Sequence, residues 1–110
     1  MNMNNTMYLR YIGVIPGMEC LEYGFQVEDK DKDPRLVVLM IESVFFKKYA
    51  LMVQEAPDLC YQKLLEALKS ETSELPINPC LPVTASDIAH YRELHPVGKS
   101  SKLRSRILVQ

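Results

Sequence analysis

The feature that most constrains this chain is the segment 54–71, in which a proline precedes an amphipathic pattern. Pro57 has no backbone N–H and a fixed φ, so it is well tolerated in the first turn of a helix. The apolar residues that follow share the spacing of one helical stripe: Tyr61, Leu64, Leu65 and Leu68. The pattern predicts a helix from about Pro57 to Ser70 that buries this stripe.

Length and composition indicate one globular domain. The chain has 110 residues, of which 47% are hydrophobic and 25% charged, close to the average for folded domains. A chain of this length can bury one core without a disulfide or a metal. We expect a disordered tail over 1–6, a single domain over 7–97 and a basic tail over 98–110.

Three segments have the composition or alternation of strands. Residues 7–15 are rich in β-branched and aromatic types and end at Pro16-Gly17, a pair favoured in tight turns. Residues 21–27 alternate apolar and polar, which predicts a strand with one solvated face. Residues 36–41 are apolar at every position, which predicts a strand covered on both faces.

The remaining segments are less regular. Residues 44–53 fit helical and strand periods about equally, and we favour a short helical turn from Val44 with Ser43 as N-cap. Residues 72–82 carry three prolines and predict a long irregular connector. Residues 87–95 predict a short second helix, for which Thr84 and Ser86 are candidate N-caps and Pro96 and Gly98 are stop signals.

These elements predict a small α+β domain with a mostly antiparallel sheet, packed by one main helix and one short helix. The sheet has three strands, or four if residues 107–109 add an edge strand. Two such helices are too few to cover both faces of strand 36–41, so the sequence predicts a homodimer. Alternatively, residues 44–53 fold over the second face and leave a monomer.

Charge and hydropathy favour a soluble cytoplasmic protein. The formal net charge is −1, which gives no overall attraction to nucleic acid or to an anionic membrane. The first residues lack the basic and apolar regions of a signal peptide, and the longest apolar run is too short to span a bilayer. The three cysteines are odd in number and far apart, as expected for free thiols in a reducing compartment.

Cys60 and Asp58 form one candidate polar site, since Cys60 lies in the first turn of the predicted helix. A helix N-terminus lowers the pKa of a thiol, which is one route to a reactive cysteine. The nearby Asp58 carboxylate opposes this effect, and cysteine is often buried as a small hydrophobe. We therefore favour a buried core thiol over a reactive one.

His90 and His95 are the only histidines and fall on the second predicted helix. Five residues of an α-helix turn through about 140° beyond one full revolution, so one helix face cannot present both to a metal. A zinc site would need further ligands at short spacing, which the sequence lacks. We predict no metal site and no cofactor, and we expect His95 to interact with carbonyls at the helix end.

The C-terminal residues carry four cations without an acidic residue: Lys99, Lys102, Arg104 and Arg106. Clustered Lys and Arg can contact phosphates without reading a sequence. Four charges are few, and no aromatic residue is interleaved to stack on bases. We favour a solvated tail, or one that folds back on acidic residues, over an anion or nucleic-acid contact.

The segments Gln54–Tyr61 and Ser86–Arg92 resemble parts of small uncharacterised bacterial proteins. The resemblance implies a bacterial cytoplasmic protein and carries over no catalytic or binding residue. The sequence itself favours a non-catalytic protein-interaction or regulatory module. The alternatives are a small nucleic-acid-binding accessory protein that uses the basic tail, and a thiol-dependent enzyme that uses Cys60.

Overall fold

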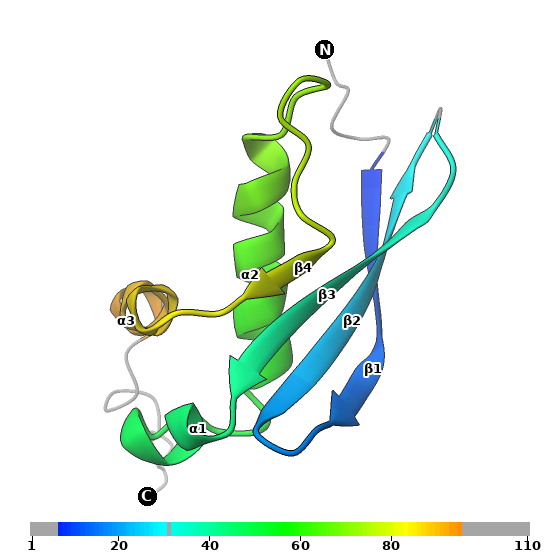
Figure 1. Ribbon diagram of the computed structural model, residues 1–110. Helices are drawn as coiled ribbons and strands as arrows, with labels where there is room; N and C mark the ends of the chain where they lie inside the picture. Colours follow the sequence, from blue (N-terminus) through cyan, green and yellow to red (C-terminus); the bar gives the residue numbers. More distant parts are fainter. Residues whose placement is uncertain (1–6, 31, 96–110) are drawn as a thin grey trace, which may run out of the picture.

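The computed structural model describes residues 7–30 and 32–95, which form an α+β fold with a four-stranded mixed sheet. The elements in chain order are β1 (Met7–Pro16), β2 (Cys20–Asp29), β3 (Arg35–Glu42), α1 (Val44–Lys48), α2 (Ala56–Lys69), β4 (Cys80–Pro82) and α3 (Ala85–Leu94) (Figure 1). The predicted α+β class is confirmed. The predicted tails, 1–6 and 98–110, lie outside the described residues.

The strands follow the order β1-β2-β3-β4, with β1 to β3 antiparallel and β4 parallel to β3. The fourth strand lies in the proline-containing segment that we expected to be an irregular connector, so that prediction was wrong for Cys80–Pro82. Backbone bonds of 2.8 Å from Val38 N–H to the Pro79 carbonyl and from Val83 N–H to the Met40 carbonyl flank it. Prolines are tolerated here because β4 is an edge strand. The other candidate fourth strand, 107–109, lies outside the described residues.

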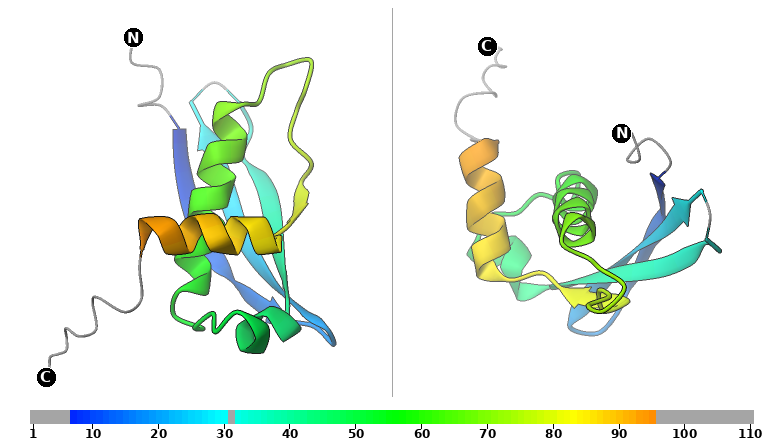
Figure 2. Two further views of the ribbon diagram at one scale, coloured as in Figure 1. Left: turned by 90° about the vertical axis from the view of Figure 1, so that its left-hand side faces the viewer. Right: turned by 90° about the horizontal axis from the view of Figure 1, so that it is seen from above.

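The core lies between one face of the sheet and the helices, which occupy the same side of it in the described residues (Figure 2). We call this side the inner face. Its strand residues are almost fully buried: Tyr23, Phe25, Val27, Val37, Leu39 and Ile41. Helix α2 packs over them along the strands, and α3 crosses over α2. The inner face therefore holds the whole described core.

Helix α2 begins one residue before Pro57, as the proline predicted, but its buried stripe differs from the expected one. Its buried residues are Ala56, Leu59, Cys60, Leu64 and Leu68. Tyr61 is exposed and Leu65 is only half-buried, so both predictions of burial were wrong. Tyr61 and Leu65 line a groove beside the edge strand β1, where no further strand of the described sheet covers them.

Strand β3 is covered on one face only, which contradicts the expectation for residues 36–41. Val37, Leu39 and Ile41 point to the inner face and are buried, whereas Leu36 is exposed. Val38 and Met40 are half-buried on the outer side of the sheet. The apolar run thus lines two surfaces, of which the described helices cover one.

The two short helices begin differently. Helix α1 starts at Val44 as favoured, but its N-cap Ser43 makes no side-chain cap hydrogen bond. Helix α3 starts with a capping box, in which the Thr84 hydroxyl accepts from Asp87 N–H and Asp87 accepts from Thr84 N–H. Each such cap is worth about 1 kcal/mol. The cap explains how the first turn of α3 is stabilised although the helix has few buried residues.

Candidate functional site

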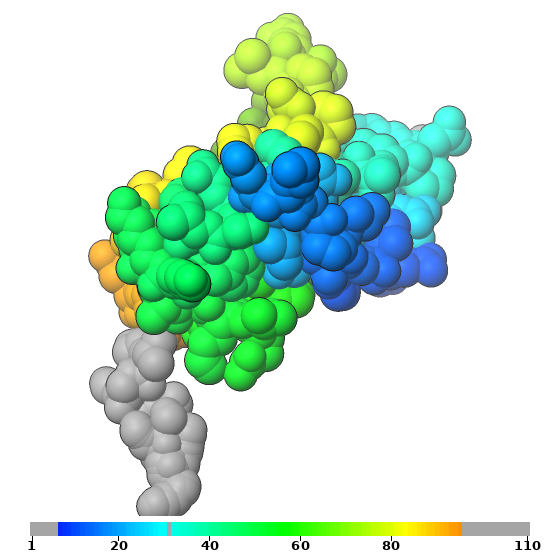
Figure 3. Space-filling model, turned by 60° about the horizontal axis from the view of Figure 1, so that its bottom comes forward, coloured from blue at the N-terminus to red at the C-terminus, as the bar shows by residue number. Residues whose placement is uncertain are grey.

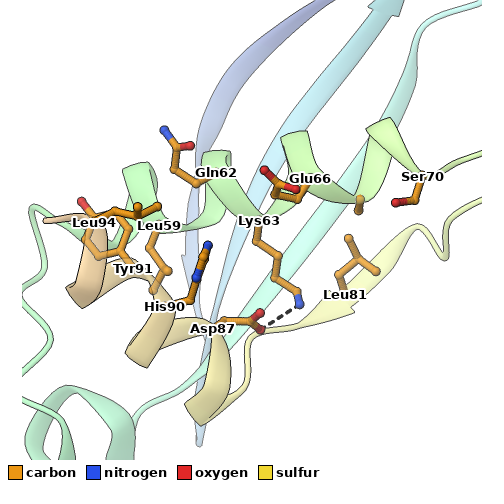
Figure 4. A pocket seen from close by; sticks show the side chains of 11 residues that line it. Leu59, Gln62, Lys63, Glu66, Ser70, Leu81, Asp87, His90, Tyr91 and Leu94 are labelled. Carbon is orange, nitrogen blue, oxygen red and sulfur yellow. Dashed lines mark hydrogen bonds and ion pairs between the residues drawn. The ribbon is translucent and has the colours of Figure 1, made fainter.

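A pocket of about 320 Å³ lies where α3 crosses α2, next to β4 (Figure 4). Its volume is at the lower end of the range for ligand pockets, about 300–1,000 Å³. Successive turns of α2 contribute Leu59, Lys63 and Ala67 to its lining, and α3 contributes His90 and Leu94. Apolar side chains such as Leu59 and Leu81 line it together with polar ones such as Lys63 and Glu66, so the pocket could hold a small molecule with an apolar body.

An ion pair crosses this pocket from α2 to α3. The Lys63 ammonium donates to Asp87 Oδ2 at 2.7 Å, and Thr84 donates to the same oxygen from its backbone and its hydroxyl. Burial alone would raise the pKa of Asp87, but these hydrogen bonds outweigh it and lower the pKa. Asp87 is therefore ionised at neutral pH, and it anchors α3 to α2.

Two further side chains of α3, Tyr91 and Arg92, hold it over the beginning of α2. The Tyr91 hydroxyl donates to Asp58 Oδ2 at 2.7 Å, and burial together with this bond raises the pKa of Tyr91. Arg92 donates to Glu55 Oε2 at 2.8 Å and to the Ala50 carbonyl at 2.9 Å. Ala50 has a φ of 54°, which is uncommon for a residue other than glycine. Asp58, a candidate from the sequence, thus has a structural partner.

Cys60 lies in the core, as we expected of a structural thiol. It is fully buried on the inner side of α2, and burial is the main cause that raises its pKa to about 12. A thiol with this pKa carries almost no thiolate at neutral pH, and thiolate is the reactive form. Cys60, Cys20 and Cys80 are all free, and Cys80 is the exposed one.

The two histidines lie at different places on α3. His90 lines the pocket, whereas His95 stacks on the Tyr91 ring with centroids 4.4 Å apart. His95 Nδ1 lies 3.3 Å from the Tyr91 carbonyl, which matches the expected contact with a carbonyl at the helix end. Over 7–30 and 32–95, no three His, Cys, Asp or Glu residues are placed to hold a metal ion.

The cations Lys99, Lys102, Arg104 and Arg106 lie outside the described residues, so the structure does not place them. Sequence reasoning also missed the α2–α3 pocket. Among the candidate residues that the structure describes, His90 alone lines it, because the pocket depends on how two helices cross rather than on a motif.

A second surface feature is a groove beside β1. It has a volume of about 470 Å³ and is lined by one end of β1 and one side of α2, including Leu9, Tyr61 and Leu65. A row of aromatic rings continues from this groove along the inner face. The ring centroids of Tyr61 and Phe25 are 6.4 Å apart, and those of Phe25 and Tyr11 are 5.3 Å apart. Figure 3 shows β1 in dark blue at one side of the molecule, with nothing over it in that view.

The third feature is the outer face, which we define as the strand side chains that point away from α2. The register places apolar side chains there from β1, β3 and β4, whereas β2 presents Glu22, Gly24, Gln26 and Glu28 between them. The apolar residues are Tyr8, Ile15, Leu36, Val38, Met40 and Pro82. Cys80 Sγ lies 3.5 Å from Met40 Sδ on the same face. Since the described helices lie on the inner side (Figure 2), this apolar surface is uncovered by them.

Comparisons with known proteins give no match: no family model, no curated protein and no solved structure matches this chain. None of the described helices is long and apolar enough to cross a membrane. Function is therefore inferred from the chain's own surfaces.

Proposed function

We propose that this protein is a non-catalytic protein-interaction module whose binding surface is the outer face of its sheet. The observation that carries the proposal is the one-sided arrangement of the described helices, which leaves apolar residues of β1, β3 and β4 at the surface. Leu36, near the start of β3, is 54% exposed on this outer side. Contiguous exposed apolar surface on a soluble domain usually marks an interaction site.

The charges of the outer face specify the partner's chemistry. The strands place these charged side chains there: Arg10, Glu22, Glu28 and Glu42. Arg10 is paired with Glu28 at 2.7 Å, and the other two of these charges are acidic, so the face carries a net negative charge beside its apolar residues. Complementary potentials favour a protein partner with apolar side chains flanked by Lys or Arg. The same potential repels phosphates, which argues against nucleic acid at this face.

The pocket and the thiol support the alternatives less well. The charged groups of the α2–α3 pocket, Lys63 and Asp87, are engaged with each other. The burial and high pKa of Cys60 oppose a thiol-dependent mechanism. Free thiols at all three cysteines support a reducing, cytoplasmic location for the proposed module.

The test compares two lysine substitutions of exposed leucines. Leu36→Lys places a cation in the outer face, whereas Leu75→Lys changes a leucine that is 72% exposed in the segment between α2 and β4. Proteins captured from a native lysate are purified and titrated calorimetrically against wild type and both variants. We expect the affinity of a true partner to fall at least about tenfold for Leu36→Lys, because the lysine replaces an apolar contact and repels the cations of the partner, and to be unchanged for Leu75→Lys.

Circular dichroism and urea unfolding serve as controls for folding, and both substituted side chains are exposed, so both variants should fold. A purified partner that binds Leu36→Lys as tightly as wild type would place the binding surface elsewhere. Turnover of a substrate by the purified chain would contradict the non-catalytic assignment.

A further inference from the structure

We propose that a second copy of this chain pairs with the outer edge of β1 through residues Met7–Tyr11, giving a two-fold dimer with one continuous sheet. The dimer uses the backbone edge of β1 together with Tyr8 and Arg10, which lie at the rim of the outer face, so it extends the proposed function without depending on the partner of that face. The structure supports the pairing through the state of the two sheet edges, the charges on β1 and the groove beside it.

The two edges of the described sheet differ in their protection. The β4 edge has three residues, contains Pro82 and leads directly into α3. Short length, proline and coverage are the usual devices that prevent strand addition. The β1 edge has ten residues, and Arg10 is its only charged residue. An exposed, long and apolar edge of this kind is a template for another strand.

A bulge limits which part of β1 can pair. The register with β2 is continuous from Met7 to Tyr11 and shifts before Gly13, which has a φ of 153°. A bulge bends the strand and interrupts the line of backbone donors and acceptors. Five regular residues remain on the N-terminal side, which is an ordinary length for a paired strand.

Charge and symmetry then select the register. In an antiparallel two-fold pair, one residue faces its own copy. An axis at Arg10 would set two guanidinium groups directly opposite, which is destabilising. An axis at Leu9 sets Leu9 against Leu9 and Tyr8 against Arg10 of the second copy, and it uses all five residues. The aromatic ring then lies beside the cation and attracts it, while Arg10 keeps its ion pair with Glu28 of its own copy.

The groove beside β1 supplies the rest of the interface. With the axis perpendicular to the sheet, both α2 helices lie on the same face, and the second copy covers the groove lined by Leu9, Tyr61 and Leu65. A fully exposed tyrosine presents about 200 Å² to solvent, and Tyr8, Tyr11 and Tyr61 are each partly exposed. Covering these three side chains and the backbone edge of β1 would remove on the order of 500 Å² of solvent-accessible surface per copy. The total of roughly 1,000 Å² reaches the lower limit for a specific interface.

The test is sedimentation equilibrium of the full chain over a wide concentration series, with two variants of opposite charge at Tyr8. This residue is 66% exposed, so the monomer should fold with either substitution. Because Tyr8 lies opposite Glu28 of β2, urea unfolding of each variant measures the effect of the new charge on the monomer itself. We expect the wild-type mass to rise from 12.7 kDa towards twice that value in the micromolar range. Tyr8→Arg faces Arg10 of the second copy and should weaken the dimer at least about tenfold. Tyr8→Glu loses the same ring but faces that cation favourably, so it should retain a dimer.

Leu36→Lys is the control for an apolar residue lost from the outer face, and it should dimerise like wild type. Dimer loss with Leu36→Lys and retention with Tyr8→Arg would overturn the β1 edge in favour of the outer face. Equal weakening by Tyr8→Arg and Tyr8→Glu would overturn the register. A mass that stays at 12.7 kDa at every concentration would overturn the dimer itself, while leaving the proposed partner binding at the outer face intact.

Discussion

The ion pair between Arg35 and Glu71 gives a quantitative prediction, because it ties the start of β3 to the segment after α2. Arg35 donates two hydrogen bonds to the Glu71 carboxylate, at 2.8 and 2.6 Å, and Ile77 N–H donates a third at 3.0 Å. The Arg35 hydrogen bond is the main cause that lowers the pKa of Glu71 from 4.5 to about 2. Glu71→Gln keeps the shape of the side chain and removes its charge.

The lowered pKa of Glu71 sets the size of the stability loss that we expect from Glu71→Gln. At about 1.4 kcal/mol for each pH unit, the change from 4.5 to about 2 corresponds to a ceiling of about 3 kcal/mol. The Arg35 side chain is 35% exposed, so solvent screening reduces the expected cost of Glu71→Gln to about 1–2 kcal/mol at neutral pH. A carboxyl group with a lowered pKa stabilises the fold above its unfolded pKa and loses that effect as the pH falls towards the folded value.

Urea unfolding of wild type and Glu71→Gln from neutral pH down to about pH 2 measures this difference. It should be constant above about pH 5 and shrink steadily below it. Glu66→Gln is the matched control, since Glu66 lies 3.7 Å from Lys69 and both are well exposed. Its cost should stay below about 0.5 kcal/mol. Equal costs for the two variants, or a Glu71→Gln cost that does not change with pH, would refute the reasoning.

Three further predictions concern the core. Leu64→Ala should lower the free energy of unfolding by about 2–5 kcal/mol, and Leu65→Ala by clearly less, because Leu64 is fully buried and Leu65 only half-buried; urea unfolding measures both. Tyr23→Phe should raise stability by about 1 kcal/mol in the same assay, because the buried Tyr23 hydroxyl has no hydrogen-bond partner among the described residues; a loss of stability would reveal a partner. In native-state alkylation near neutral pH, the exposed Cys80 should react well before the buried Cys60; fast labelling of Cys60 would contradict the assigned burial.

Local signals predicted the elements better than their packing. Pro57 marked the start of α2 and Thr84 capped α3, because both effects depend on backbone groups within a few residues. The orientation of α2 was harder to predict, since Tyr61 and Leu65 continue its apolar pattern at a place where the described sheet ends. Periodicity shows that a side chain is apolar, but not whether another element lies opposite it.

The fourth strand and the pocket could not be read from the sequence for a similar reason. A segment as short as Cys80–Pro82 has no strand period, and it pairs because β3 offers an open edge distant in the chain. The pocket at Lys63 and His90 exists because α3 crosses α2, which depends on contacts such as the bond from Tyr91 to Asp58. Both features are tertiary, so local propensity carries little information about them.

The parallel pairing of β3 with β4 has a consequence for the order of folding. β1 to β3 join neighbours through short turns, whereas β4 must close a loop that contains both α1 and α2. Loop closure of this kind costs entropy before any contact repays it, so non-local pairs form late. We expect the three-stranded meander with α2 to form first and β4 with α3 to dock last. The last segment to dock is also the first to open, so Leu59, Lys63 and the other α2 residues that line the pocket would be transiently exposed to solvent without global unfolding.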